Sequence, residues 1–137
     1  MFRNILVAVD GTSTAHKAVE VAGGLARLNG ARLNVIHVAR DAVDAWQAER
    51  DGMPDSTDEI VAREAAFLVS EGHEKPRQHV ALGDPAWVIV DFARHNDVDL
   101  VIMGGNGRNG LDALLSGSVS HEVTRNAPCT CITVWNG

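Results

Sequence analysis

Short apolar runs alternate with segments of helical periodicity along the whole chain, and this alternation limits the possible folds more than any other feature. The first run, residues 3–9, is rich in aliphatic residues and ends at Asp10, as a buried parallel strand does. Apolar residues then recur at helical spacing over 15–28, and Gly30 supplies a stop. The pattern predicts a first β-α unit.

The same unit repeats to the end of the chain, with no linker or internal repeat, so we expect one domain over residues 1–137. Strands that alternate with helices form a parallel sheet covered on both faces. All strands then end at one edge, which places Asp10, Val38 and Gly104 together. The further strands are expected at 33–38, 79–82, 100–103 and 129–135, and the further helices at about 57–71, 85–96 and 117–126.

Composition and charge exclude several classes of protein. The chain is 45% hydrophobic over 137 residues, enough for a core of its own. Its apolar stretches fall far short of the roughly 20 residues that cross a bilayer, and Asp10 interrupts the first one too early for a signal peptide. We therefore expect a cytoplasmic protein without a membrane span. The net charge of −6 argues against a nucleic-acid-coating protein, which needs a basic stripe.

The acidic residues and the two cysteines are unevenly placed. Residues 41–74 contain ten acids and two arginines, and so carry −8, which leaves +2 for the rest of the chain. Cys129 and Cys131 alternate on one expected strand, so their side chains point the same way and a mutual disulfide is not expected. We expect both thiols to be buried as small apolar groups.

A glycine-rich segment follows the fourth expected strand and runs from Gly104 to Gly117. Glycines allow backbone N–H groups to approach a ligand closely, and the helix start at Gly117 adds unsatisfied N–H groups that favour phosphate. Ser118 and Ser120 add hydroxyl donors. The alternative is a tight connection that needs positive φ. The segment has no Walker lysine, and it lacks the acidic residue that completes the dinucleotide fingerprint.

The spacing Gly104-x2-Gly107-x9-Gly117-Ser118 resembles the nucleotide-binding signature G-x2-G-x9-G-[ST] of the universal stress protein family. Residues 5–11, 83–85, 99–104 and 127–129 are also similar to the family's pattern. The resemblance implies a five-stranded parallel sheet in the order 3-2-1-4-5 with helices on both faces, a Rossmann-like or flavodoxin-like three-layer α/β fold. It also implies a homodimer through the last strand.

The resemblance further implies a site for ATP, ADP or AMP, in which Asp10 contacts the ribose or a phosphate-bound Mg²⁺. The chain departs from the family at Ala8, where ATP-binding members often have proline, and at Gly105-Asn106, which replaces a hydroxyl and basic pair. The backbone of Val9 and Val38 would frame the adenine, and the glycines and serines would cradle the phosphates. The residues expected to line the site are Val9, Asp10, Val38, Met103, Gly104, Gly107, Arg108, Gly117, Ser118, Val119 and Ser120.

Catalytic motifs do not stand out. No Ser-His-Asp set, thiol-histidine pair or metal cluster is placed by motif, so we expect no enzyme, or at most slow ATP hydrolysis. The sequence favours a nucleotide-binding regulatory module of the stress response that acts on an unidentified protein partner. The alternatives are a protein-interaction dimer that binds no nucleotide and, third, an adenylyl-transferring or flavodoxin-like enzyme. We expect the loop 39–55 to bring Trp46 onto the nucleotide edge or the dimer neighbour.

Overall fold

The computed structural model describes residues 1–40, 57–105 and 117–135. Five parallel strands form one sheet in the order β3-β2-β1-β4-β5, which confirms the expected fold class and strand order. The elements are β1 (Asn4–Ala8), α1 (Ser13–Asn29), β2 (Arg32–Ala39), α3 (Thr57–Ser70), β3 (Arg77–Leu82), α4 (Pro85–His95), β4 (Leu100–Gly104), α5 (Gly117–Asn126) and β5 (Thr130–Val134).

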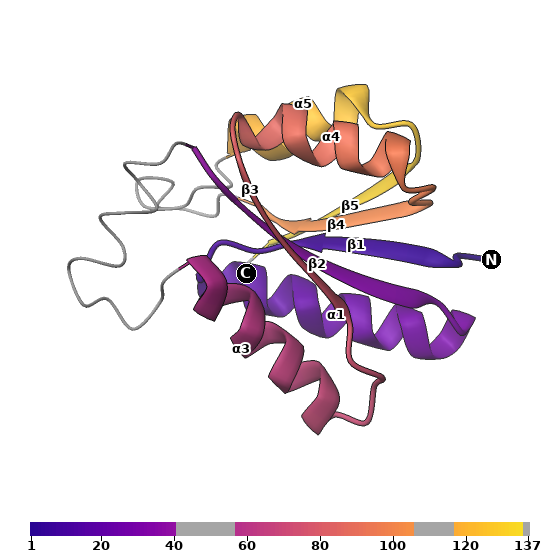
Figure 1. Cartoon of the computed structure of the whole chain (residues 1–137). Helices are drawn as coiled ribbons and strands as arrows, with labels where there is room; N and C mark the ends of the chain where they lie inside the picture. The colour runs from indigo at the N-terminus through magenta and orange to yellow at the C-terminus, as the bar shows by residue number, and fades with distance from the viewer. Residues whose placement is uncertain (41–56, 106–116, 136–137) are drawn as a thin grey trace.

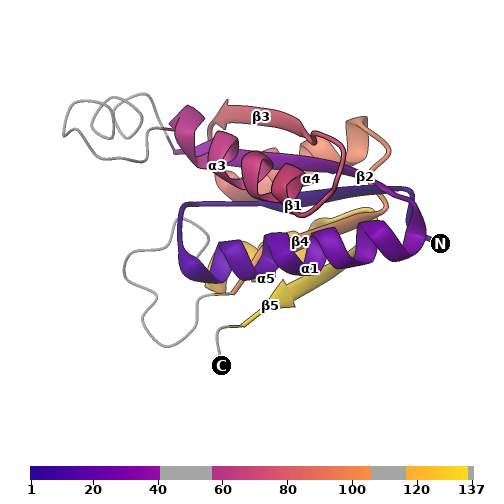
Figure 2. The same ribbon diagram turned by 90° about the horizontal axis from the view of Figure 1, so that it is seen from below.

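The sheet lies between two helical layers. Helices α1 and α3 cover one face, and α4 and α5 cover the other (Figure 1; Figure 2 shows the molecule turned by 90°). Alternate residues of β1 divide between the two cores, because side chains along a strand point to opposite faces. Ile5 and Val7 pack toward α1 and α3, whereas Leu6 and Ala8 pack toward α4 and α5. The central strands are therefore buried on both sides.

Local sequence signals fix where the helices begin and end. The Thr12 side chain caps α1, and Gly30 ends that helix with a left-handed φ of 65°. Asp84 caps α4, and Pro85 occupies its first turn, where the missing N–H of proline has no intrahelical partner to lose. Among the described residues, no helix is both long enough and apolar enough to span a bilayer.

The structure corrects several expectations. Strand β3 begins at Arg77 rather than at residue 79, because Arg77 pairs with Asn34 of β2. Leu28, the last residue of the apolar pattern over 15–28, is 84% exposed, and Val69, near the end of α3, is 48% exposed. Both cysteines are free, as expected. They are half-buried rather than buried, because β5 is the last strand of the sheet.

Candidate functional site

The carboxyl edge of the sheet contains the point where the strand order reverses. Strand β1 pairs with β2 on one side and with β4 on the other. The chain therefore adds β2 and β3 on one side of β1 and then crosses back to add β4 and β5 on the other side. Ligands of open α/β sheets bind outside the carboxyl ends of the strands at such a point. Asp10 follows β1, Val38 lies near the end of β2, and Gly104 ends β4. The structure thus brings these three predicted residues to one edge.

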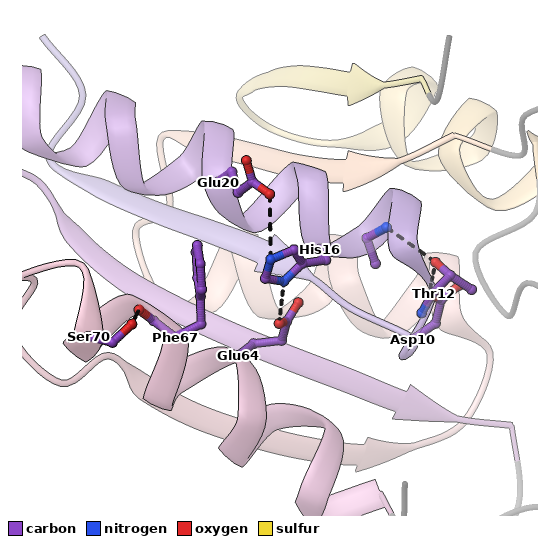
Figure 3. Close-up of polar contacts among 8 residues, drawn as sticks. Asp10, Thr12, His16, Glu20, Glu64, Phe67 and Ser70 are labelled. Atoms are coloured by element: carbon purple, nitrogen blue, oxygen red, sulfur yellow. Dashed lines mark hydrogen bonds and ion pairs between the residues drawn. The ribbon is translucent and has the colours of Figure 1, made fainter.

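A short turn joins β1 to α1 and fixes the Asp10 carboxylate. Gly11 has a φ of 85°, which a side chain would disfavour. Asp10 Oδ1 accepts hydrogen bonds from the Thr12 backbone N–H at 3.0 Å and from the Thr12 hydroxyl at 2.5 Å. The Thr12 hydroxyl oxygen accepts in turn from the Ala15 N–H at 3.2 Å (Figure 3). The helix cap and the acidic side chain are therefore one hydrogen-bonded unit.

Gly104 lies against the first turn of α1. A Cβ atom at this position would meet the Ala15 backbone nitrogen and two atoms of Thr14, all at 3.0 Å. Its φ lies outside the range that disfavours side chains. The position therefore favours glycine for reasons of space, because β4 and the start of α1 approach so closely.

Gly105 has a different neighbour. Its N–H donates to the Val134 carbonyl of β5 at 2.7 Å, and a Cβ atom here would meet the Trp135 ring at 2.5 to 2.7 Å. The Trp135 ring thus covers the backbone at the start of the glycine-rich segment, although the residue remains 56% exposed. The sequence motif did not reveal this contact, because the two residues are 30 positions apart.

The residues expected to frame an adenine are largely buried. Val9, Val38 and Met103 are all less than 5% exposed. The Val9 N–H donates to the Ile36 carbonyl at 2.9 Å, and the Val9 carbonyl lies 2.8 Å from Nδ1 of the buried His37. Both backbone polar groups of Val9 therefore already have partners within the protein.

Helix α5 begins at Gly117 at the same edge. A helix start leaves N–H groups without intrahelical partners and so attracts anions. The predicted phosphate residues Val119 and Ser120 lie in its first turn, and both are buried. Ser118 is also in this turn, whereas Gly107, Arg108 and Trp46 lie outside the described residues.

A polar cluster that the sequence analysis did not anticipate joins α1 to α3. His16 Nδ1 lies 2.8 Å from the carboxylate of Glu64, which is 6% exposed, and His16 Nε2 lies 3.5 Å from Glu20 (Figure 3). The Phe67 ring packs edge-on against the imidazole, with ring centres 4.5 Å apart. The cluster joins α3 to the beginning of α1, one turn beyond the cap residue Thr12. Helical spacing could have placed Glu64 on the buried face of α3, since it lies four residues from both Ile60 and Leu68.

The residues at this edge fit a phosphorylated ligand better than a tightly held metal. Backbone N–H groups at the start of α5 and the anchored carboxylate of Asp10 are suited to a phosphate and to a hydroxyl group, respectively. Within the described part of the chain, no three His, Cys, Asp or Glu side chains gather as metal ligands. A cation here would therefore depend on ligand and water oxygens for most of its coordination.

Comparisons with known proteins agree with this geometry. The model of the Universal stress protein family matches residues 1–134. Universal stress protein YxiE of Bacillus subtilis is 32% identical over 148 aligned positions, which cover 98% of this chain and 99% of YxiE. The structure of UspA from Lactobacillus plantarum has a TM-score of 0.79 and 26% identity, covering 97% of each chain. An Archaeoglobus fulgidus universal stress protein in complex with dAMP has the same fold, with a TM-score of 0.74, 22% identity and 98% coverage of each chain.

Proposed function

Because the chain belongs to the universal stress protein family, we propose that it binds an adenine nucleotide at the carboxyl edge and acts as a regulatory module of the stress response. One observation carries the proposal. The glycine signature spans the gap between Gly104, beside the start of α1, and Gly117, at the start of α5. Gly104 ends β4 beside the point where the strand order reverses, and Gly117 begins the helix that follows. The dAMP complex of the Archaeoglobus relative supports an adenine nucleotide as the ligand.

The residues of the proposed site would contact different parts of the nucleotide. The N–H groups at Gly117, Ser118, Val119 and Ser120 would bind phosphate oxygens, and Gly107 and Arg108 would complete the cradle. Asp10, which is fixed by Thr12, would accept a hydrogen bond from a ribose hydroxyl or hold a Mg²⁺ ion that arrives with ATP. The buried Val9, Val38 and Met103 give the site an apolar floor. We propose binding without rapid turnover, over residues 1–137 as one domain.

Assembly is part of the proposal. Strand β5 lies at an end of the sheet, and Ile132 and Val134 on it are partly buried hydrophobic residues. An apolar edge strand pairs readily with another chain. We propose a homodimer through β5, which would add cover to Trp135. Light scattering should give a dimer for the wild type and a monomer for Val134→Lys; a monomeric wild type would reject this part.

The alternative function, a protein-interaction dimer that binds no nucleotide, is favoured by two contacts. A side chain at Gly104 would crowd the backbone of α1, and one at Gly105 would displace the Trp135 ring. Each of these glycines therefore has a reason to be present that does not involve a ligand. The two functions differ in one measurable property, the affinity for adenine nucleotides.

The decisive experiment is calorimetric titration with ATP, ADP and AMP, with and without Mg²⁺. Gly117→Asp should weaken binding at least tenfold, about 1.4 kcal/mol, because it places a negative charge at the helix start. Gly24→Asp is the matched control, since Gly24 is exposed in α1 and a Cβ there meets nothing within 4 Å. No binding by the wild type, or equal affinity of the two variants, would favour the alternative. Phosphate release should stay near the uncatalysed rate.

A further inference from the structure

The amino-terminal edge of the sheet lies opposite the proposed nucleotide site, and β1 begins there beside the N label in Figure 1. Polar side chains line a second region at this edge. Two pockets of about 650 and 470 Å³ open there, and both are lined by Gly30, Arg32 and Arg77. Volumes of this size are typical of sites for small molecules. We call the larger one the amino-edge groove; the residues used below are Asn4, Arg32, Asn34, Arg77, His79 and Phe92.

Strand register places the polar side chains of the groove on one face. Asn4 of β1 pairs with Arg32 of β2, and Asn34 of β2 pairs with Arg77 of β3. Side chains two residues apart on a strand point the same way. Arg32 and Asn34 therefore share the face of Ile36, which packs toward α4. His79, which pairs with Ile36, lies on this face too.

The floor of the groove is held rigid by hydrogen bonds. Asn34 is only 4% exposed, and its Nδ2 donates to Asn4 Oδ1 at 2.8 Å and to the Ile5 carbonyl at 3.2 Å. Its Oδ1 lies 3.3 Å from His79 Nε2, which fits a donor N–H on that nitrogen. The Phe92 ring of α4 packs on the imidazole, with ring centres 4.6 Å apart. The His79 ring therefore has a fixed orientation.

Two arginines, Arg32 and Arg77, line the groove beside this floor. Within the described residues, the guanidinium groups of Arg32 and Arg77 form no hydrogen bond or ion pair with the protein. The nearby Asp99 is already engaged, because its carboxylate accepts from the backbone N–H groups of Arg3 and Asn4 at 2.8 and 3.1 Å. Burial, and then the charge of Arg77, lower the pKa of His79. Three arginines and two aspartates line the groove, Arg3, Arg32, Arg77, Asp97 and Asp99, and Glu74 lines the adjoining pocket. Basic side chains therefore outnumber acidic ones in the groove itself, in a chain of net charge −6.

The spacing of the arginines suits one small anion. Neighbouring strands are about 4.8 Å apart and each residue advances about 3.3 Å, so the diagonal pair has Cα atoms about 8 Å apart. Two long side chains can converge across this distance on one group, and each guanidinium offers a planar fork for two oxygens. We propose that the amino-edge groove binds a doubly charged oxyanion, such as a phosphate monoester or a dicarboxylate, between Arg32 and Arg77.

The test uses inorganic phosphate and succinate as probes, titrated into the full chain at pH 7 and low salt by calorimetry. Arg32→Gln and Arg77→Gln should each weaken binding at least tenfold. Arg125→Gln is the control, because it removes the same charge from the last turn of α5, which packs beside β5 at the other end of the sheet. Phosphate binding alone would indicate a phosphate ester as the ligand, and succinate binding alone a dicarboxylate; either supports the proposal.

A second readout is the titration of His79, followed by NMR of its ring protons. The charged groups that line the groove with it are Arg3, Arg32, Arg77, Asp97 and Asp99. A bound anion favours the protonated imidazole, so either probe at saturation should raise the pKa of His79. Two results would overturn the proposal. One is the absence of binding by either probe at 10 mM, in which case the arginines would only balance the partial negative charge at the carboxyl ends of the helices. The other is an equal loss of affinity in Arg125→Gln.

Discussion

The close approach of β4 to α1 predicts opposite effects for the same substitution at two glycines. In Gly104→Ala, the new methyl group would lie 3.0 Å from three atoms of Thr14 and Ala15, whereas carbon atoms normally pack at about 3.5 to 4.0 Å. Two of these three atoms belong to the backbone, and the Thr12 cap holds that turn in place. The strain cannot be relieved by rotating a side chain, so β4 and α1 must separate by several tenths of an ångström.

The expected cost is that of overpacking a close-packed core, about 1 to 3 kcal/mol, which lowers the melting temperature by about 4 °C per kcal/mol in a domain of this size. Gly24→Ala is the control. A Cβ atom at Gly24 meets nothing within 4 Å, and alanine in a helix interior is more stable than glycine by about 0.5 to 1 kcal/mol. The free energy of unfolding should therefore fall in the first variant and rise in the second.

Urea unfolding followed by circular dichroism, at one fixed protein concentration, measures both changes. The concentration must be fixed because any association through β5 would add to the apparent stability. If Gly104→Ala were as stable as the wild type, the contact with α1 would not be the reason for glycine at this position. A role of Gly104 in ligand binding would then be better supported.

Three further predictions follow from the polar contacts. His16→Ala should lower the free energy of unfolding by about 1 to 3 kcal/mol, because it leaves the buried carboxylate of Glu64 without its partner; Glu64→Gln in the same chain should recover part of the loss in urea unfolding. Thr12→Ala should cost about 1 kcal/mol through the lost cap of α1, and an unchanged urea midpoint would refute the role of the cap. Burial, and then the neighbouring Cys129, raise the pKa of Cys131 to about 11, so alkylation of Cys131 in a Cys129→Ala variant should still be accelerating at pH 10, and a plateau below pH 9 would contradict this.

The α/β class was predictable because its signals are local and repeated, whereas the strand order came from the family resemblance. Strands β1 and β4 are nearly continuous apolar runs, β2 is apolar apart from Arg32, Asn34 and His37, and α1 and α4 carry apolar stripes with caps at their ends. The sequence did not reveal the start of β3, because Arg77 and Gln78 are polar and extend the strand only by pairing with Asn34 and Val35 of β2. Tertiary pairing, rather than local propensity, sets that boundary.

The candidate site was predictable only in part, for a related reason. Asp10 and Gly104 were placed by topology, since parallel strands end at one edge. The contacts of His16 with Glu64 and of Gly105 with Trp135 join elements that are far apart in the chain. Sequence spacing can mark Glu64 as lying on the buried face of α3, but it cannot identify the side chain that lies opposite. Such pairs become visible only when the helices and strands are packed together.

The packing of the glycines changes how the signature should be interpreted. Gly104 would be favoured in this fold even without a ligand, because its neighbour is the backbone of α1. Gly105 departs from the usual family residue at a position where any side chain would displace the Trp135 ring, and that ring lies beside the strand through which we propose dimerisation. Packing of β4 and β5 therefore explains Gly104 and Gly105 as well as a bound ligand would. The argument for a nucleotide consequently depends on the second half of the signature, where Gly117 begins α5 and a helix start presents N–H groups that have no intrahelical partner. A substitution at Gly117, rather than at Gly104, is the change that separates binding from folding.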